Sequence, residues 1–122
     1  MKIIEAIQKV DALKPNSYSQ EDKIKWLSTL DGIVKKEIID THVGGNEIVL
    51  NDYDLSSLEV ELLIPAPYDD IYIKWLEAQI DYNSSEIGKY NNSMAMFNSA
   101  YGNYERDYNR THMPIGKKIK YF

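Results

Sequence analysis

Two histidines, His42 and His112, are the side chains of this sequence most suited to bind a metal ion, and no cysteine accompanies them. Neither stands in a ligand-spaced motif with a second histidine or a carboxylate, as a zinc site requires. Both lie near the expected ends of helices, where the helix dipole favours an imidazole. We therefore interpret both as structural residues and predict that the chain holds no metal.

Acidic residues are the other candidates for chemistry. Residues 51–54, Asn-Asp-Tyr-Asp, resemble the start of a calcium loop but lack its glycine and later glutamate, so a solvated turn is expected. Glu77 and Asp81 are four residues apart on an expected helix, where we predict solvated carboxylates or a pair with Lys74. Phosphate-binding glycine loops and nucleophile elbows are missing from the sequence. We predict no catalytic residue, no cofactor and no enzymatic activity.

The composition indicates one globular domain spanning residues 1–122, with a net charge of −5. This charge is uneven: residues 1–108 hold nineteen acids and ten bases, whereas residues 109–122 hold four bases and no acid. An acidic body argues against a nucleic-acid-binding face, and a basic tail is a candidate arm. No apolar run is long enough to cross a bilayer and no signal peptide is evident, so a cytoplasmic protein without membrane contact is expected.

A seam of apolar and aromatic residues runs through the second half of the chain and organises the expected fold. Its members are spaced by three or four residues, which is the spacing of one helix face. They are Ile73, Leu76, Ile80, Asn83, Ile87, Tyr90, Met94, Phe97, Tyr101, Tyr104 and Tyr108. The seam predicts helix over residues 69–108, about 60 Å long if it is continuous. Residues 83–86 read as a capping box and Gly88 is a poor helix former, which favours a break. Either one long helix or two nearly coaxial helices meeting near Asn83 are expected.

Two shorter helices precede this element. The first is predicted over residues 2–13 and ends before Pro15. The second is predicted over residues 19–41, with Ser19 as its N-cap and the following glycine pair as its end.

The segments outside these helices are expected to be extended. Residues 44–64 form an insertion in which a small β-hairpin is plausible, with strands near residues 47–50 and 60–64. Residues 109–122 form a tail that alternates enough for a strand or orders only on meeting a partner. The predicted fold class is therefore mainly α, a helical bundle built on one long C-terminal helix, continuous or broken, with an extended insertion and tail.

The tyrosine-rich end of the seam has two interpretations. A stripe at helical spacing is usually packed in the core, but so many tyrosines also suit a seam between subunits. The basic tail is either a frayed terminus or an arm that orders on assembly. The candidate interface residues are Tyr101, Tyr104, Tyr108, Lys117, Lys118, Lys120, Tyr121 and Phe122.

Six segments of the chain carry a resemblance to a known family. They are residues 7–16 (IQKVDALKPN), 25–32 (KWLSTLDG), 37–42 (EIIDTH), 63–72 (LIPAPYDDIY), 90–98 (YNNSMAMFN) and 108–114 (YNRTHMP). The first three resemble segments of small structural proteins from prophage late operons. Together the six are similar to head–tail connector proteins of the head-completion adaptor type, from long-tailed bacteriophages and prophages of Gram-positive hosts.

This resemblance implies a virion structural protein that binds beneath the portal as a homo-oligomeric ring of about a dozen copies and joins the capsid to the tail. The implied partners are the portal protein and a tail-side connector or stopper protein, and DNA passes through the ring without specific binding. The implied location is the host cytoplasm during assembly and then the neck of the virion. The insertion 44–64 and the tail 109–122 match the segments with which such adaptors hold the portal and their neighbours. The alternative is a small helical protein-binding or scaffold module that forms no ring, and an isolated monomer is compatible with both.

Overall fold

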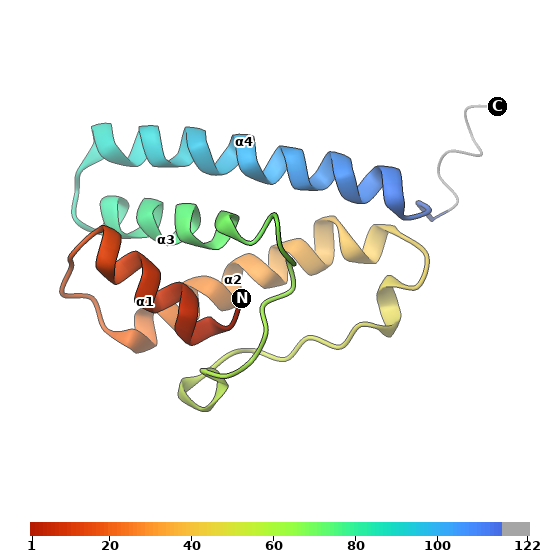
Figure 1. Ribbon diagram of the computed structural model, residues 1–122, viewed down its shortest axis with the longest axis horizontal. Helices are drawn as coiled ribbons and strands as arrows, with labels where there is room; N and C mark the ends of the chain where they lie inside the picture. Colours follow the sequence, from red (N-terminus) through yellow and green to blue (C-terminus); the bar gives the residue numbers. More distant parts are fainter. Residues whose placement is uncertain (116–122) are drawn as a thin grey trace.

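The computed structural model describes residues 1–115, which form four α-helices and three short 3₁₀ helices (Figure 1). The described part of the chain is mainly helical, as predicted. The elements follow in the order α1 (Ile3–Leu13), α2 (Gln20–Glu37), η1 (Ile39–Thr41), η2 (Gly45–Glu47), η3 (Leu55–Ser57), α3 (Asp70–Asn83) and α4 (Ile87–Thr111). In Figure 1, α4 lies along one side of the molecule, α3 lies between the first half of α4 and α1, and the C-terminal end of α2 lies beside the second half of α4.

The first two helices begin and end close to their predicted limits. In α2 the Ser19 hydroxyl accepts a hydrogen bond of 3.0 Å from the backbone N–H of Asp22, which confirms the predicted N-cap. The helix ends at Glu37, before the predicted limit at residue 41, because the last turn tightens into η1. Gly44 then adopts a positive φ of 85°, a conformation that glycine accepts without steric cost.

The long seam is broken, and the expected coaxial arrangement of its two halves is wrong. The helix α3 ends at Asn83, and α4 begins at Ile87 and returns antiparallel along α3 (Figure 1). The reversal occurs at Ser85, whose φ of 59° is left-handed, and the Glu86 N–H closes the turn on the Asp81 carbonyl at 3.0 Å. The two halves of the seam therefore face each other within one chain, and each covers the apolar side of the other.

The predicted capping box at residues 83–86 is also wrong. The Asn83 side-chain amide donates to the Gln79 carbonyl inside α3 at 2.8 Å, so it belongs to the end of α3. Glu86 precedes α4 in the N-cap position and makes no side-chain cap hydrogen bond. The polar residues of this stretch thus terminate one helix instead of starting the next.

The insertion forms no β-hairpin within the described residues, which corrects that prediction. Backbone groups of residues 58–62 pair instead with the start of α1. The Leu62 N–H donates to the Met1 carbonyl at 3.0 Å, and the Ile3 N–H donates to the Val60 carbonyl at 3.0 Å. A single antiparallel bridge joins Lys2 to Glu61. Backbone groups of the second predicted strand are therefore paired with the N-terminal residues and not with residues 47–50.

One core joins all four α-helices. Its largest fully buried apolar side chains come from α1, α2, α3 and the segment before α3: Ile3, Val10, Ile24, Leu27, Leu30, Val34, Ile38, Ile64, Ile71, Tyr72 and Leu76. The helix α4 contributes Phe97 and Tyr104, and the Phe97 ring lies 5.1 Å from that of Trp75 in α3. The seam residues Phe97 and Tyr104 thus pack into the core of their own chain.

Candidate functional site

The three described members of the predicted interface lie on the C-terminal half of α4 but differ in exposure. Tyr104 is buried, whereas Tyr101 and Tyr108 are half-buried. The Tyr101 hydroxyl donates to the carboxylate of Glu37 in α2 at 3.2 Å. Burial, assisted by the negative charge of Glu37, raises the pKa of Tyr101. The other predicted members, Lys117, Lys118, Lys120, Tyr121 and Phe122, lie outside the described residues.

Beside Tyr104 and Tyr108 the surface is hollowed into a groove with a volume of about 450 Å³, which we call the apolar groove. It is bounded by the last turns of α4, by the segment before α3, and by two residues of the region after α2. Its lining residues are Ile39, Ile48, Leu62, Leu63, Pro65, Ala66, Pro67, Tyr68, Tyr104, Asp107, Tyr108, Thr111 and His112. This composition, mostly apolar and aromatic with a few polar groups, is typical of binding sites.

A chain of aromatic rings forms the α4 wall of the groove. The rings of Tyr68 and Tyr104 are 5.5 Å apart, and those of Tyr104 and Tyr108 are 5.9 Å apart. Tyr108 stacks on His112 at 3.8 Å with an interplanar angle of 2°. Ring pairs at such distances contribute roughly 0.5–1.5 kcal/mol each beyond their buried area, so the contacts favour this arrangement of the rings.

Both histidines lie at this end of the molecule and close helices, as the sequence predicts. His42 is buried, and its Nδ1 donates to the Ile38 carbonyl at 2.6 Å. Its Nε2 lies 2.8 Å from the side-chain oxygen of Asn109, which ties the end of α2 to the end of α4. The rings of His42 and His112 are 6.3 Å apart, and no cluster of three or more metal-binding side chains occurs in residues 1–115.

A buried carboxylate, Asp31 of α2, holds the insertion against the helices, and it is not among the candidate residues predicted from the sequence. Its two oxygens accept hydrogen bonds of 2.5 Å from the hydroxyls of Tyr53 and Tyr72 and one of 3.1 Å from the Leu63 N–H. The Tyr72 hydroxyl itself accepts from the Ile64 N–H at 2.7 Å. Asp31 follows Leu27 by four residues and precedes Val34 by three, so its place on the core face of α2 was the available signal.

Burial sets the protonation behaviour of this cluster. It raises the pKa of the Asp31 carboxyl, and the two tyrosine hydroxyls and the Leu63 amide oppose that rise. It also raises the pKa of Tyr53 and Tyr72, and the neighbouring Asp31 adds to the effect. For Tyr104, burial raises the pKa to about 12. These three buried tyrosines (Tyr53, Tyr72 and Tyr104) are therefore neutral throughout the physiological range, and Tyr53 and Tyr72 donate hydrogen bonds to Asp31.

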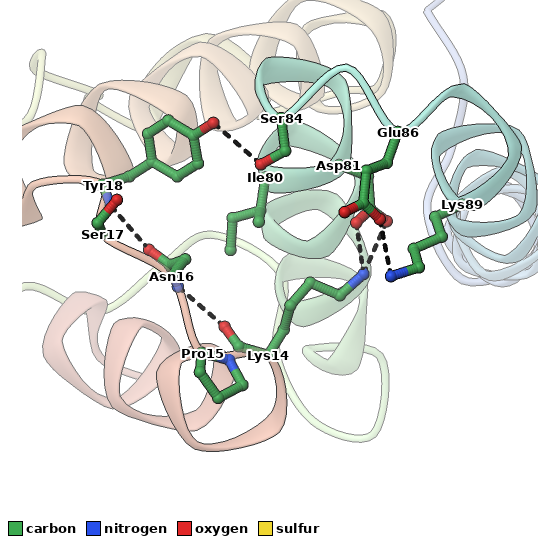
Figure 2. Close-up of a pocket in the computed structure, with 10 residues that line it drawn as sticks. All are labelled: Lys14, Pro15, Asn16, Ser17, Tyr18, Ile80, Asp81, Ser84, Glu86 and Lys89. Carbon is green, nitrogen blue, oxygen red and sulfur yellow. Dashed lines mark hydrogen bonds and ion pairs between the residues drawn. The ribbon is translucent and has the colours of Figure 1, made fainter.

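A second, polar pocket of about 290 Å³ lies where the turn between α1 and α2 meets the junction of α3 and α4 (Figure 2). Both carboxylate oxygens of Asp81 accept from the Lys14 ammonium at 2.7 Å, and the Ser93 hydroxyl donates to Asp81 at 2.8 Å. Asp81 is buried, which corrects the prediction of a solvated residue or a pair with Lys74; Lys74 pairs with Asp70. Its charged groups are matched to each other, so the pocket is a structural junction.

Residue 43 and the insertion 44–64 present further apolar side chains to solvent, and of these only Ile48 lines the groove. They are Val43, Ile48, Val49, Leu55 and Val60, and we call them the exposed insertion residues. Val49 is 79% exposed and Val43 is 62% exposed. Exposed apolar groups gathered on one segment mark an interaction surface more often than isolated ones do.

Comparisons with known proteins give no further guide to function, because no family model, no curated protein and no solved structure matches this chain. Within residues 1–115, none of the helices has both the length and the apolar character needed to span a membrane.

Proposed function

We propose that this protein is a head–tail connector of a long-tailed bacteriophage or prophage, an adaptor that binds beneath the portal as a ring and joins the capsid to the tail. The proposal begins from the six segments that resemble such adaptors. The portal protein and a tail-side connector or stopper protein are its proposed partners. Its proposed location is the host cytoplasm during assembly and the virion neck afterwards.

The observation that best supports the proposal is the pairing of a rigid helical body with an irregular, apolar insertion. Residues 48–54 are anchored at Tyr53, through its hydroxyl to Asp31 and through its N–H to the Ser28 hydroxyl at 3.1 Å. The exposed insertion residues, including Val49 and Val60, surround that anchor and face solvent. A fixed base with an apolar projecting segment suits a protein that must fit between two larger assemblies.

The charge of the chain is compatible with a ring around DNA. The described residues 1–115 carry nineteen acids and eleven bases, a net charge of −8. A negative surface repels the phosphate backbone and does not retain passing DNA.

The test is the mass in solution of the purified protein, alone and mixed with the portal protein encoded near it. We expect a portal-sized complex with about one copy of this protein per portal subunit. A protein that remains separate from the portal at high concentration would refute the adaptor proposal. The alternative, a helical protein-binding or scaffold module without a ring, would then be the better description.

A matched pair of variants tests the contribution of the insertion. Val49→Glu places a charge on the insertion, whereas Ile87→Glu places the same charge at the start of α4, the end remote from the groove. Both original side chains are exposed, so neither change should disturb the fold. We expect Val49→Glu to weaken portal binding at least tenfold and Ile87→Glu to leave it unchanged. Equal binding by both variants would remove the insertion from the interface.

A further inference from the structure

The apolar groove lies close to the point at which the described chain ends. The segment 113–115 runs antiparallel to residues 41–43: the Val43 N–H donates to the Met113 carbonyl at 2.8 Å, and the Ile115 N–H donates to the Thr41 carbonyl at 2.9 Å. A bridge also pairs Pro114 with His42. The chain therefore continues from a fixed point, three residues after His112, which lines the groove.

The residues that follow have a composition complementary to this groove. Residues 116–122 read Gly-Lys-Lys-Ile-Lys-Tyr-Phe, with three bases, no acid and three large apolar or aromatic side chains. The groove is lined by tyrosine, proline, leucine and isoleucine, and within the described chain no lysine or arginine lines it.

Acidic side chains lie at and near the groove. Asp107 is a lining residue, its side chain is about one third exposed, and it pairs with Arg110 at 3.2 Å. Glu47 and Glu61 are exposed sequence neighbours of the lining residues Ile48 and Leu62, although neither lines the groove, and Glu61 binds the N-terminal ammonium at 3.0 Å. The net charge of −8 on residues 1–115 faces a net side-chain charge of +3 on residues 116–122. Opposite net charges on the two parts of the chain favour their association.

The size of the apolar groove and the length of residues 116–122 are also compatible with binding of this segment in the groove. A volume of about 450 Å³ falls in the range of sites that enclose small ligands, and it suits one or two aromatic side chains. Seven extended residues reach up to about 25 Å, and Gly116 offers the backbone freedom for a reversal. A short tether also holds the segment at an effective concentration of about 1 mM or more, so a weak intrinsic affinity is sufficient.

We propose that the apolar groove binds residues 119–122 of the same chain, with the rings of Tyr121 and Phe122 against the Tyr68 and Tyr104 wall and the lysines toward the acidic rim. The groove is then filled in the isolated protein. Any partner that uses this surface must first displace the tail, which makes the tail a competitor for the site. This proposal does not depend on the proposed function, because it concerns the protein alone.

Paramagnetic relaxation measured by NMR on the full chain tests it. The sequence has no cysteine, so Lys120→Cys supplies one position for a nitroxide spin label. We expect the amide signals of Leu63, Tyr68 and Thr111 to lose most of their intensity relative to the reduced label, and those of α1 to keep theirs. Unchanged signals around the groove would overturn the proposal.

A mixed sample identifies which chain supplies the tail. Isotope-labelled protein without the nitroxide is combined with unlabelled protein that carries it. Binding within one chain predicts no broadening in this mixture. Broadening around the groove would show instead that a second copy supplies the segment, and would overturn the assignment to the same chain.

Two arginine variants provide the matched control. Thr111→Arg puts bulk and positive charge into the groove, whereas Asn98→Arg makes the same change at an exposed position of α4 that does not line it. We expect Thr111→Arg to abolish the broadening and Asn98→Arg to retain it. An equal effect of the two variants would contradict binding in the groove, and an unchanged amide spectrum of α1 and α2 would establish that both variants are folded.

Discussion

Replacing Tyr72 with phenylalanine removes one hydroxyl from the centre of the protein and tests whether the Asp31 cluster holds the insertion in place. The hydroxyl makes two hydrogen bonds: it donates to Asp31 at 2.5 Å and accepts from the Ile64 N–H at 2.7 Å. Tyr72, Ile64 and Asp31 are all completely buried, so water cannot replace the lost partner. The substitution keeps the ring and creates no large cavity, which isolates the polar effect.

The expected cost follows from the two bonds. An unpaired buried N–H costs about 1–3 kcal/mol, and loss of a hydrogen bond to a carboxylate costs about 1.5–3 kcal/mol. We therefore expect Tyr72→Phe to lower the free energy of unfolding by about 3–5 kcal/mol. Because small domains have only about 5–15 kcal/mol in total, this is a large fraction of their stability.

Urea denaturation followed by the fluorescence of Trp26 and Trp75 measures this change. With a denaturant dependence of about 2 kcal/mol per molar, the transition midpoint should fall by about 2 M. Tyr53→Phe removes only the bond to Asp31 and should cost about 1.5–3 kcal/mol. Tyr82→Phe is the control, because Tyr82 is 59% exposed, and should change stability by less than about 0.5 kcal/mol. If Tyr72→Phe is no more destabilising than Tyr82→Phe, the cluster does not hold the fold and the reasoning is wrong.

Three further predictions concern pH, the polar pocket and the glycines. Burial raises the pKa of Tyr53, Tyr72 and Tyr104, so above pH 10 the unfolded chain loses protons that the folded chain keeps. The free energy of unfolding, measured in urea, should therefore fall by up to about 4 kcal/mol per pH unit. A flat profile from pH 9 to 11 would contradict this prediction. Asp81→Ala breaks the buried ion pair with Lys14 and should cost about 3 kcal/mol in the same assay. Asp70→Ala breaks the surface ion pair with Lys74 and should cost less than about 1 kcal/mol. Equal losses would refute the distinction between the buried and the surface pair. Gly45→Ala places a methyl group 1.9 Å from a backbone carbonyl oxygen of η1 and should lower the free energy of unfolding by about 2–3 kcal/mol. Gly88→Ala meets no atom within 4 Å and should raise the free energy of unfolding by up to about 1 kcal/mol. Changes of the same sign in both variants would be inconsistent with the structure.

The helices and their buried faces follow from the sequence because both depend on residues close together in the chain. The apolar spacing of Ile3, Ile7 and Val10 predicts α1, and Ser19 marks the start of α2. Of the seam residues, Phe97 and Tyr104 are buried as the spacing predicts, whereas Asn83 and Ile87 beside the turn are exposed. Local periodicity and capping contain this information, so it can be obtained without a tertiary structure.

The arrangement of the seam and of the candidate site depends on the tertiary structure. Spacing alone is the same for two coaxial helices and for an antiparallel pair, and the left-handed turn at Ser85 selects the second. That reversal brings the end of α4 beside the segment before α3, so Tyr68 meets Tyr104 and the apolar groove forms between them. The groove exists only because segments 36 residues apart are packed together, and no local pattern encodes that pairing.

The amino-acid sequence predicts a mainly helical chain, the Ser19 cap and most of the buried helix faces, because these depend on neighbours within a few residues. The burial of Asp31 and Asp81 and the identity of their hydrogen-bonding partners follow only from the packed structure. A carboxylate on a helix is equally consistent with solvent or with a distant donor. For Asp31 the choice was made by Tyr53, Tyr72 and the Leu63 N–H, which lie 22 to 41 residues away. The physical reason is that a buried polar group requires a hydrogen-bonding partner but does not specify where along the chain that partner lies.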